Sequence, residues 1–120
     1  MGEIYQTVLL VGTKGSLRIN AFFDSGSADN HLRKILSNGV EVERTIGTLK
    51  YLGPGISTLA NDEEFEEEKM VFKSAEVIGC CSFNPVFLMS DSLVDDMIIG
   101  YEAMQQMGLK LDFVADTIRY

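Results

Sequence analysis

Cysteine, histidine and tryptophan are scarce in this sequence, which has two cysteines, one histidine and no tryptophan. The cysteines, Cys80 and Cys81, are adjacent, and adjacent cysteines seldom have the geometry of an unstrained disulfide. We therefore expect one buried and one exposed thiol on a strand, in a reducing, cytoplasmic setting. The single histidine, His31, completes no spacing typical of a metal site with them, so we expect no metal ion and no cofactor.

Basic residues and long apolar runs are also few. The chain has 10 lysines and arginines against 18 aspartates and glutamates, which gives a formal net charge of -8. Nucleic acids and anionic membranes both bind clustered basic side chains, so the composition argues against either partner. No apolar run reaches the ~18 residues that a membrane-spanning helix needs, and the run at 8–11 lacks the basic flank and the length of a signal peptide.

The sequence does contain a series of short segments with strand composition, in a chain whose length suits one domain, 1–120. Residues 4–11 and 17–21 predict a β-hairpin, because alternating apolar runs flank a glycine-bounded turn. Further strands are predicted at 40–43, 45–51, 70–72, 75–81, 85–89, 95–100 and 109–113, with a tail or strand at 114–120.

Two short helices and one loop complete this prediction. One helix is predicted at 31–36, capped by Asp29 or Asn30 and ended by Gly39, and the other at 101–107, ended by Gly108. The acidic run at 61–69 is typical of a solvated loop.

One stretch places chemically active residues directly after an apolar run: Ala21-Phe22-Phe23-Asp24-Ser25-Gly26-Ser27. A carboxylate at the edge of an apolar segment is a candidate for controlled protonation, because burial penalises its charged form. A strand followed by an ordinary Asp-Ser-Gly turn is the simpler interpretation of these residues alone. The pair Asp95-Asp96 does not predict converging carboxylates, because neighbours on a strand face opposite ways.

Two further motifs accompany this stretch. Ile98-Ile99-Gly100 precedes the second predicted helix, and Leu109-Lys110-Leu111-Asp112-Phe113 follows it. In this order, and after the N-terminal hairpin, these motifs resemble a retropepsin, the single-domain aspartic protease of retroviruses and retrotransposons. The resemblance implies an all-β, closed barrel-like acid-protease fold with one or two short helices. It also implies a homodimer, because each retropepsin subunit carries one catalytic aspartate.

The resemblance further implies roles for individual residues. Asp24, Ser25 and Gly26 would be catalytic: two copies of Asp24 would share one proton and activate a water, while Ser25 would hydrogen-bond across the dimer. The flap that closes over an extended peptide or protein substrate would have Gly53-Pro54-Gly55 at its tip, with Thr45-Ile46-Gly47 as an alternative tip. The implied substrate-binding residues are Gly26, Ala28, Asp29, Gly53, Pro54, Gly55 and Ile99.

Two positions depart from the retroviral pattern. Tyr101 stands where retroviral members commonly have arginine, and Ala28 stands where they have an acid. A non-catalytic retropepsin-like module for dimerisation or peptide binding is therefore an alternative function. A third hypothesis is a hydrolase with Ser25 as the nucleophile and His31 as the base, but the glycine-flanked turn that presents such a serine is absent.

Overall fold

The computed structural model of the chain describes residues 4–58, 64–112 and 117–119. The described elements are β1 (Tyr5–Val11), β2 (Ser16–Phe23), β3 (His31–Arg33), α1 (Val42–Ile46), β4 (Lys50–Thr58), β5 (Glu64–Val71), β6 (Ser74–Val77), β7 (Cys81–Phe83), β8 (Val86–Ser90), β9 (Met97–Ile99), α2 (Tyr101–Met107), β10 (Lys110–Asp112) and β11 (Thr117–Arg119). The fold is therefore mostly β with two short helices, as predicted.

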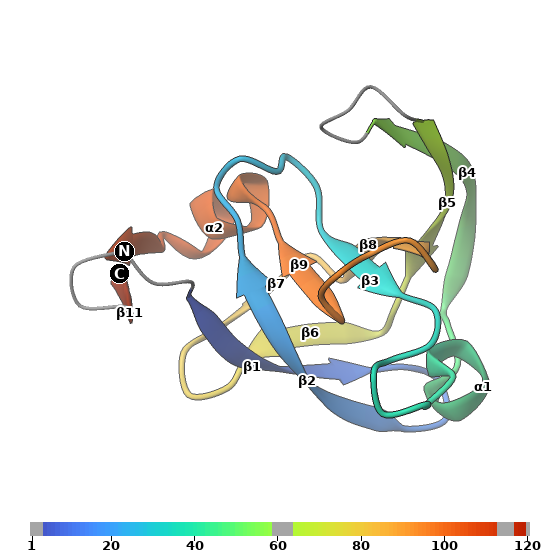
Figure 1. Cartoon of the computed structure of the whole chain (residues 1–120). Coiled ribbons are helices and arrows are strands. Elements are labelled where there is room, and N and C mark those ends of the chain that lie inside the picture. Colours follow the sequence, from blue (N-terminus) through green and yellow to red (C-terminus); the bar gives the residue numbers. More distant parts are fainter. Residues whose placement is uncertain (1–3, 59–63, 113–116, 120) are drawn as a thin grey trace.

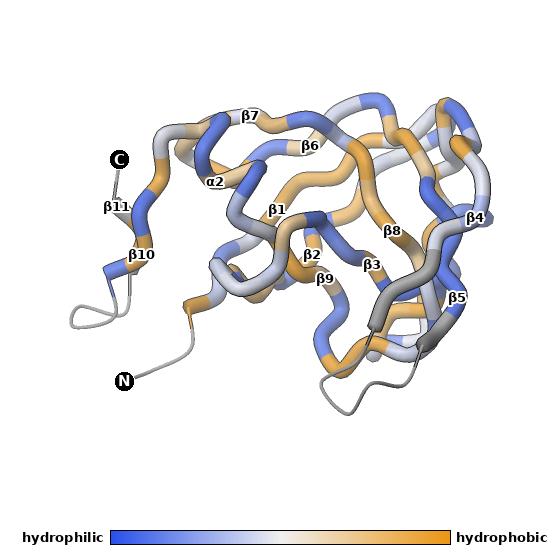
Figure 2. The backbone as a smooth tube through the Cα atoms, turned by 90° about the horizontal axis from the view of Figure 1, so that it is seen from above, coloured by the Kyte–Doolittle hydropathy of each residue, from blue (hydrophilic) through white to orange (hydrophobic). Residues whose placement is uncertain are grey.

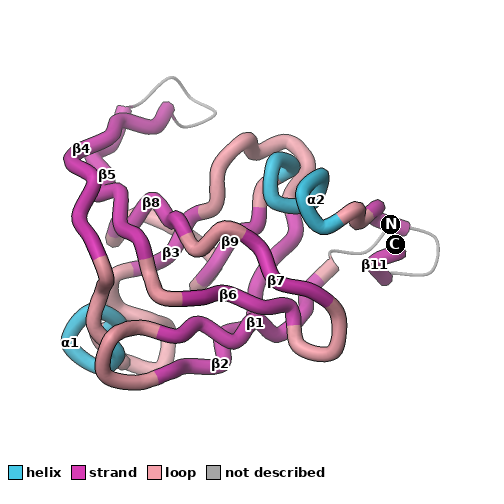
Figure 3. Tube along the Cα trace, turned by 180° about the vertical axis from the view of Figure 1, so that it is seen from behind, coloured by secondary structure: helices cyan, strands magenta, loops and turns pink. Residues whose placement is uncertain are grey.

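Nine of these strands form one large sheet with the order β4-β5-β8-β3-β9-β2-β1-β6-β7 (Figure 1). A second sheet of β10 and β11 lies beyond α2, apart from the large one (Figure 2). The hairpin of β4 and β5 projects from the body of the molecule, and the two helices lie at opposite ends (Figure 3). Within the described ranges no hydrogen bonds join the edge strands β4 and β7, so closure of the barrel stays a prediction.

Several predicted elements are confirmed. Strands β1 and β2 form the N-terminal hairpin, with the buried Val8 opposite the buried Ile19. The helix predicted at 101–107 is α2, and it ends at Gly108, whose φ of 69° lies in the left-handed region that favours glycine. The predicted segments 85–89, 95–100 and 109–113 contain β8, β9 and β10, and the C-terminal tail contains β11.

The predicted helix at 31–36 is wrong, because this segment begins with strand β3. Strand β3 pairs in parallel with β8 and antiparallel with β9, so it lies inside the large sheet. Its central residue, Leu32, is fully buried there. Pairing with two strands that are distant in sequence outweighs the local capping signals at Asp29 and Gly39.

The strands predicted at 40–43 and 45–51 are also largely wrong, because α1 occupies Val42–Ile46. Val42 and Ile46 are both buried and four residues apart, which is the spacing of one helix face. The alternation of Val40, Glu41, Val42 and Glu43 is typical of a strand, but Val40 lies before α1 and Val42 begins it. The alternative flap tip, Thr45-Ile46-Gly47, accordingly lies in α1 and its C-terminal cap.

The loop predicted at 61–69 and the tip predicted at Gly53-Pro54-Gly55 are replaced by two long strands. Gly53, Pro54 and Gly55 lie inside β4, opposite Lys69, Glu68 and Glu67 of β5. Because β4 is an edge strand, Pro54 can lie in it although proline donates no hydrogen bond. The connection between the two strands, at 59–63, lies outside the described residues.

The two cysteines correct another prediction. Cys80 and Cys81 form a disulfide at the turn between β6 and β7, where Gly79 has a φ of 81°. Both residues are partly buried, so the expected pair of one buried and one exposed thiol is wrong. The predicted strand at 75–81 is consequently two strands that meet at this turn.

The buried apolar side chains of the strands and of both helices form one core. Phe87 packs its ring near those of Phe72 and Phe83, with centroid separations of 5.9 and 6.1 Å. Phe23 and Ile99, which end β2 and β9, are buried in the same core and so anchor the segments that follow them. In the part of the chain that the structure describes, no helix has the length and apolar character needed to cross a membrane.

Candidate functional site

Asp24 stands where two parallel strands end side by side. Strand β2 pairs in parallel with β9, and the last pair is Phe23 with Ile99. The Asp24 amide then donates a hydrogen bond to the Ile99 carbonyl oxygen at 3.0 Å. The Asp24 residue is partly buried, whereas Ser25 and Gly26 are exposed. The buried ends of both strands therefore fix the backbone of a carboxylate that solvent and ligands can reach.

The turn after Asp24 orients its carboxylate. The Gly26 amide donates to Asp24 Oδ1 at 2.9 Å, and the Ser27 amide donates to the Asp24 carbonyl oxygen at 3.1 Å. A Cβ added to Gly26 would lie 3.2 Å from the same Oδ1. Glycine at this position thus lets the backbone amide approach the carboxylate closely, which holds one oxygen of Asp24 in a fixed direction.

A second contact fastens this loop to the start of α2. Asn30 Oδ1 accepts a hydrogen bond from the Gly100 amide at 2.9 Å, and the Ser27 carbonyl oxygen accepts one from the Tyr101 amide at 2.8 Å. A Cβ on Gly100 would lie 2.6 to 2.8 Å from the carbonyl oxygens of Ser27, Ala28 and Asp29. The two motifs identified in the sequence, around Asp24 and around Gly100, are therefore in direct contact.

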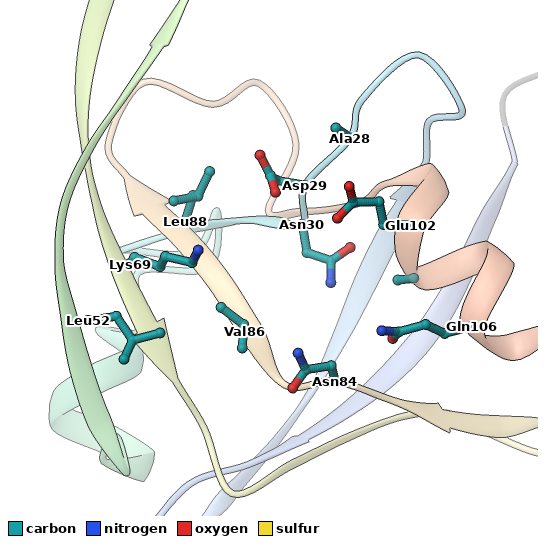
Figure 4. A pocket seen from close by; sticks show the side chains of 11 residues that line it. Ala28, Asp29, Asn30, Leu52, Lys69, Asn84, Val86, Leu88, Glu102 and Gln106 are labelled. Carbon is teal, nitrogen blue, oxygen red and sulfur yellow. The ribbon is translucent and has the colours of Figure 1, made fainter.

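A cavity of about 320 Å³ lies beside this loop (Figure 4). The hairpin of β4 and β5 forms one wall, α2 forms another, and Val86 and Leu88 of β8 lie between them. Its lining residues are Ala28, Asp29, Asn30, Leu52, Lys69, Asn84, Val86, Leu88, Glu102, Ala103 and Gln106. Six of these eleven residues have polar or charged side chains, so the cavity is more polar than most pockets that bind small molecules.

The structure brings only some of the predicted substrate-binding residues to this cavity. Ala28 and Asp29 line it, but the side chain of Ile99 is fully buried in the core, and only its carbonyl oxygen reaches the Asp24 loop. Gly53, Pro54 and Gly55 lie in the neighbouring hairpin wall without lining the cavity. Substrate contact by Ile99 and by these three residues stays a prediction.

Sequence reasoning missed most of the lining residues. Glu102, Ala103 and Gln106 lie on one face of α2, a spacing that the predicted helix already contained. Lys69 and Leu88 are opposite each other on β5 and β8, and no local signal could have shown this pairing.

His31 has a different partner from the one that a serine hydrolase needs. Its Nδ1 lies 2.9 Å from Glu67 Oε2, and the described hydrogen bonds include none between His31 and Ser25. Asp95 and Asp96 do not converge either: Asp95 accepts from the Tyr5 hydroxyl, and Asp96 accepts from the amide and the hydroxyl of Ser37. In the described residues no group of three potential ligands could hold a metal ion.

Comparison with solved structures finds several retropepsin-like proteins with this architecture. The retroviral protease-like domain of Ddi1 from Leishmania major matches with a TM-score of 0.63 and 13% identity, covering 99% of this chain and 88% of that one. A retropepsin-like aspartic protease from Rickettsia conorii matches with a TM-score of 0.57 and 20% identity, over 92% and 85% of the two chains. The protease of simian foamy virus matches with a TM-score of 0.55 and 13% identity, over 88% and 97%.

These similarities define the fold. No protein-family model matches the chain, and no curated protein matches its sequence. Because the neighbours span nearly the whole chain, however, the chain has a retropepsin-like fold. The resemblance that the motifs around Asp24 and Gly100 indicated is thereby confirmed at the level of the fold.

Proposed function

We propose that this chain is an aspartic endopeptidase that acts as a homodimer. The proposal rests on the way the structure holds Asp24. The Gly26 amide donates a hydrogen bond to its carboxylate, and hydrogen bonds from Gly100 and Tyr101 fasten the same loop to α2. The described part of each chain contains one such loop, and so a pair of aspartates needs two copies related by a two-fold axis. The retropepsin-like fold supports this arrangement.

The chemistry follows from two carboxylates that share one proton. The ionised Asp24 takes a proton from a bound water, whose oxygen attacks the peptide carbonyl carbon. The protonated Asp24 of the other copy donates a hydrogen bond to the carbonyl oxygen and so stabilises the charge that develops there. Transfer of a proton to the leaving nitrogen then breaks the C–N bond and yields a carboxylic acid and an amine, with no metal or cofactor.

The substrate is an extended peptide that lies along the Asp24 loop. The cavity beside Ala28 and Asp29 accepts one of its side chains, and the projecting hairpin of β4 and β5 serves as the flap. Gly26 binds the peptide backbone, and Ser25, which is exposed in the single chain, hydrogen-bonds across the dimer. Gly53, Pro54 and Gly55 form part of the flap's edge strand instead of its tip.

A peptide library tests this function directly. We expect the purified protein to cleave mixed peptides between about pH 4 and 7, the range that a shared-proton pair of carboxylates suggests. Sedimentation should show dimers over the concentrations at which cleavage occurs, and activity per chain should fall on dilution as the dimer dissociates. Intact peptides at concentrations where the chain is dimeric would contradict an endopeptidase and would favour a non-catalytic module for dimerisation or peptide binding.

Substitution of Gly26 should weaken catalysis more than it weakens the fold. In Gly26→Ala the new Cβ lies 3.2 Å from Asp24 Oδ1, so the carboxylate must shift by a few tenths of an ångström. We expect a loss of about tenfold or more in kcat, because catalytic geometry tolerates little displacement. Steady-state kinetics measures the effect, and an unchanged urea midpoint separates it from unfolding. Wild-type kcat in Gly26→Ala would contradict the proposed orientation of Asp24.

A further inference from the structure

The hairpin of β4 and β5 extends past its pairing with β8 from Glu67 onward. On one side of β5, pairing with β8 stops at Glu68 and Met89. On the other side, pairing with β4 continues to Glu64 and Thr58. Glu67 is therefore the first residue of β5 beyond its pairing with β8, in the hairpin that projects from the body of the molecule (Figure 1). Any motion of the projecting hairpin relative to β8 has to bend the chain near this position.

Glu67 is unusual because its carboxylate is inside the protein. Its side chain is 0% exposed, and within the described ranges only Glu67 and Ser90 are buried residues with polar side chains. Glu67 Oε2 lies 2.9 Å from Nδ1 of His31, whereas Oε1 is buried without a hydrogen-bond partner. Burial of a half-satisfied carboxylate is costly, and apolar side chains of similar size would fill the same space at least as well. Stability alone therefore does not explain this pair.

The partner, His31, belongs to the strand that continues the Asp24 loop. It directly follows Asn30, whose side chain holds the Gly100 amide and whose carbonyl oxygen accepts from the Leu88 amide at 2.9 Å. In the sheet, His31 is opposite Ile98 of β9 and Leu88 of β8. Leu88 lines the cavity, and it also lies 3.4 Å from where a Cβ on Gly55 would be. The contact between His31 and Glu67 thus joins the Asp24 loop to the root of the hairpin.

We propose that His31 and Glu67 are a positioning pair, which fixes the hairpin of β4 and β5 relative to the Asp24 loop. The effect of the pair on substrate binding rests on the proposed function, whereas its effect on the position of the hairpin does not. One hydrogen bond joins Nδ1 of His31 to Oε2 of Glu67, and it links β3 to β5 through side chains alone. The bond is directional, so it selects one angle of the hairpin where apolar packing would permit several.

Other charged groups near the pair do not replace it. Lys34 pairs with Glu68 at 3.2 Å, but both side chains are substantially exposed, at 35% and 42%. Such exposed pairs contribute about 1 kcal/mol or less. Arg33, on the same strand as His31, has a buried Nε without a hydrogen-bond partner, and Lys69 of β5 lines the cavity. Glu68 is therefore a matched control, since it is the adjacent glutamate on the same strand with an exposed partner.

Hydrogen exchange tests the pair without relying on catalysis. In Glu67→Ala we expect the backbone amides of 50–58 and 64–67 to exchange about tenfold faster or more, because the hydrogen bond to His31 Nδ1 is lost. Glu67→Gln retains an acceptor for Nδ1 and should recover much of the protection, whereas Glu68→Ala should leave it near the wild-type level. The double variant His31→Leu with Glu67→Met should fold stably but still exchange faster in the hairpin.

Two readouts decide between positioning and simple structural support. Faster exchange must be confined to the hairpin while the urea midpoint of Glu67→Gln stays near the wild-type value. In an active protein, KM for peptides should rise about tenfold in Glu67→Ala with a smaller change in kcat, because a loosened hairpin binds substrate less well. Uniform acceleration across the sheet, equal effects of Glu68→Ala, or full protection in the double variant would overturn the proposal. Inactivity of every variant, wild type included, would overturn the proposed function alone and leave the exchange result decisive.

Discussion

Asp24→Asn should abolish peptide cleavage while the fold and the dimer persist. An amide cannot take a proton from water, so a dimer of this variant lacks both the general base and the shared proton. We expect kcat/KM to fall by at least about 10³-fold, at the upper part of the range for loss of acid–base catalysis. The oxygen of the substituted side-chain amide would still accept a hydrogen bond from the Gly26 backbone amide, as Oδ1 of Asp24 does, and so the loop should keep its shape.

Two measurements make this expectation specific to a paired aspartate. Mixing the variant with equal wild-type protein should leave about one quarter of the dimers with two Asp24 residues after random exchange of subunits. Activity per wild-type chain should therefore fall on mixing, although no wild-type protein has been removed. Asp91→Asn is the control, because Asp91 is an exposed carboxylate that neither belongs to the Asp24 loop nor lines the cavity. Cleavage that survives in Asp24→Asn, or a mixed sample with undiminished activity, would rule out the shared pair.

The sequence predicts best those elements whose signals are local. The hairpin of β1 and β2 has alternating burial and a short turn, and α2 has Gly100 before it and Gly108 after it. The motif at Asp24 is also local, because the buried Phe23 and the turn at Gly26 lie within two residues of it. The sequence predicts these features because residues close to them in the chain determine them.

The elements that sequence reasoning missed depend on partners far along the chain. Strand β3 exists because β8 and β9 flank it, and β5 is a strand despite its acidic composition because it pairs with β4. The buried Glu67 is the clearest example, since the acidic run around it gave only the signal of a solvated loop. The cavity was missed for the same reason, because the hairpin, β8 and α2 each contribute only a part of it.

Gly100→Ala should destabilise the protein more than any other single methyl group added at the candidate site. The φ and ψ of Gly100 are -88° and 175°, which alanine adopts without strain, so the backbone conformation itself costs little. The added Cβ, however, would lie 2.6 Å from the Asp29 carbonyl oxygen, 2.7 Å from that of Ser27 and 2.8 Å from that of Ala28. These atoms belong to the backbone and cannot rotate away as the end of a side chain can. We expect the free energy of unfolding to fall by about 3 kcal/mol or more, at the upper end of the cost of overpacking.

Gly108, at the opposite end of α2, is a control: its variant shows whether α2 tolerates any added methyl group at its ends. Gly108 has a φ of 69° and no heavy atom within 4 Å of an added Cβ, so Gly108→Ala bears only the cost of left-handed backbone, about 1 kcal/mol. Urea unfolding should therefore rank Gly100→Ala well below Gly108→Ala in stability. Where Gly100→Ala remains folded at low temperature, peptide cleavage should still be lost, because separation of the Asp24 loop from α2 breaks the hydrogen bond from Tyr101 to Ser27. Equal stability of the two variants would contradict the close packing of the two motifs, on which the presentation of Asp24 depends.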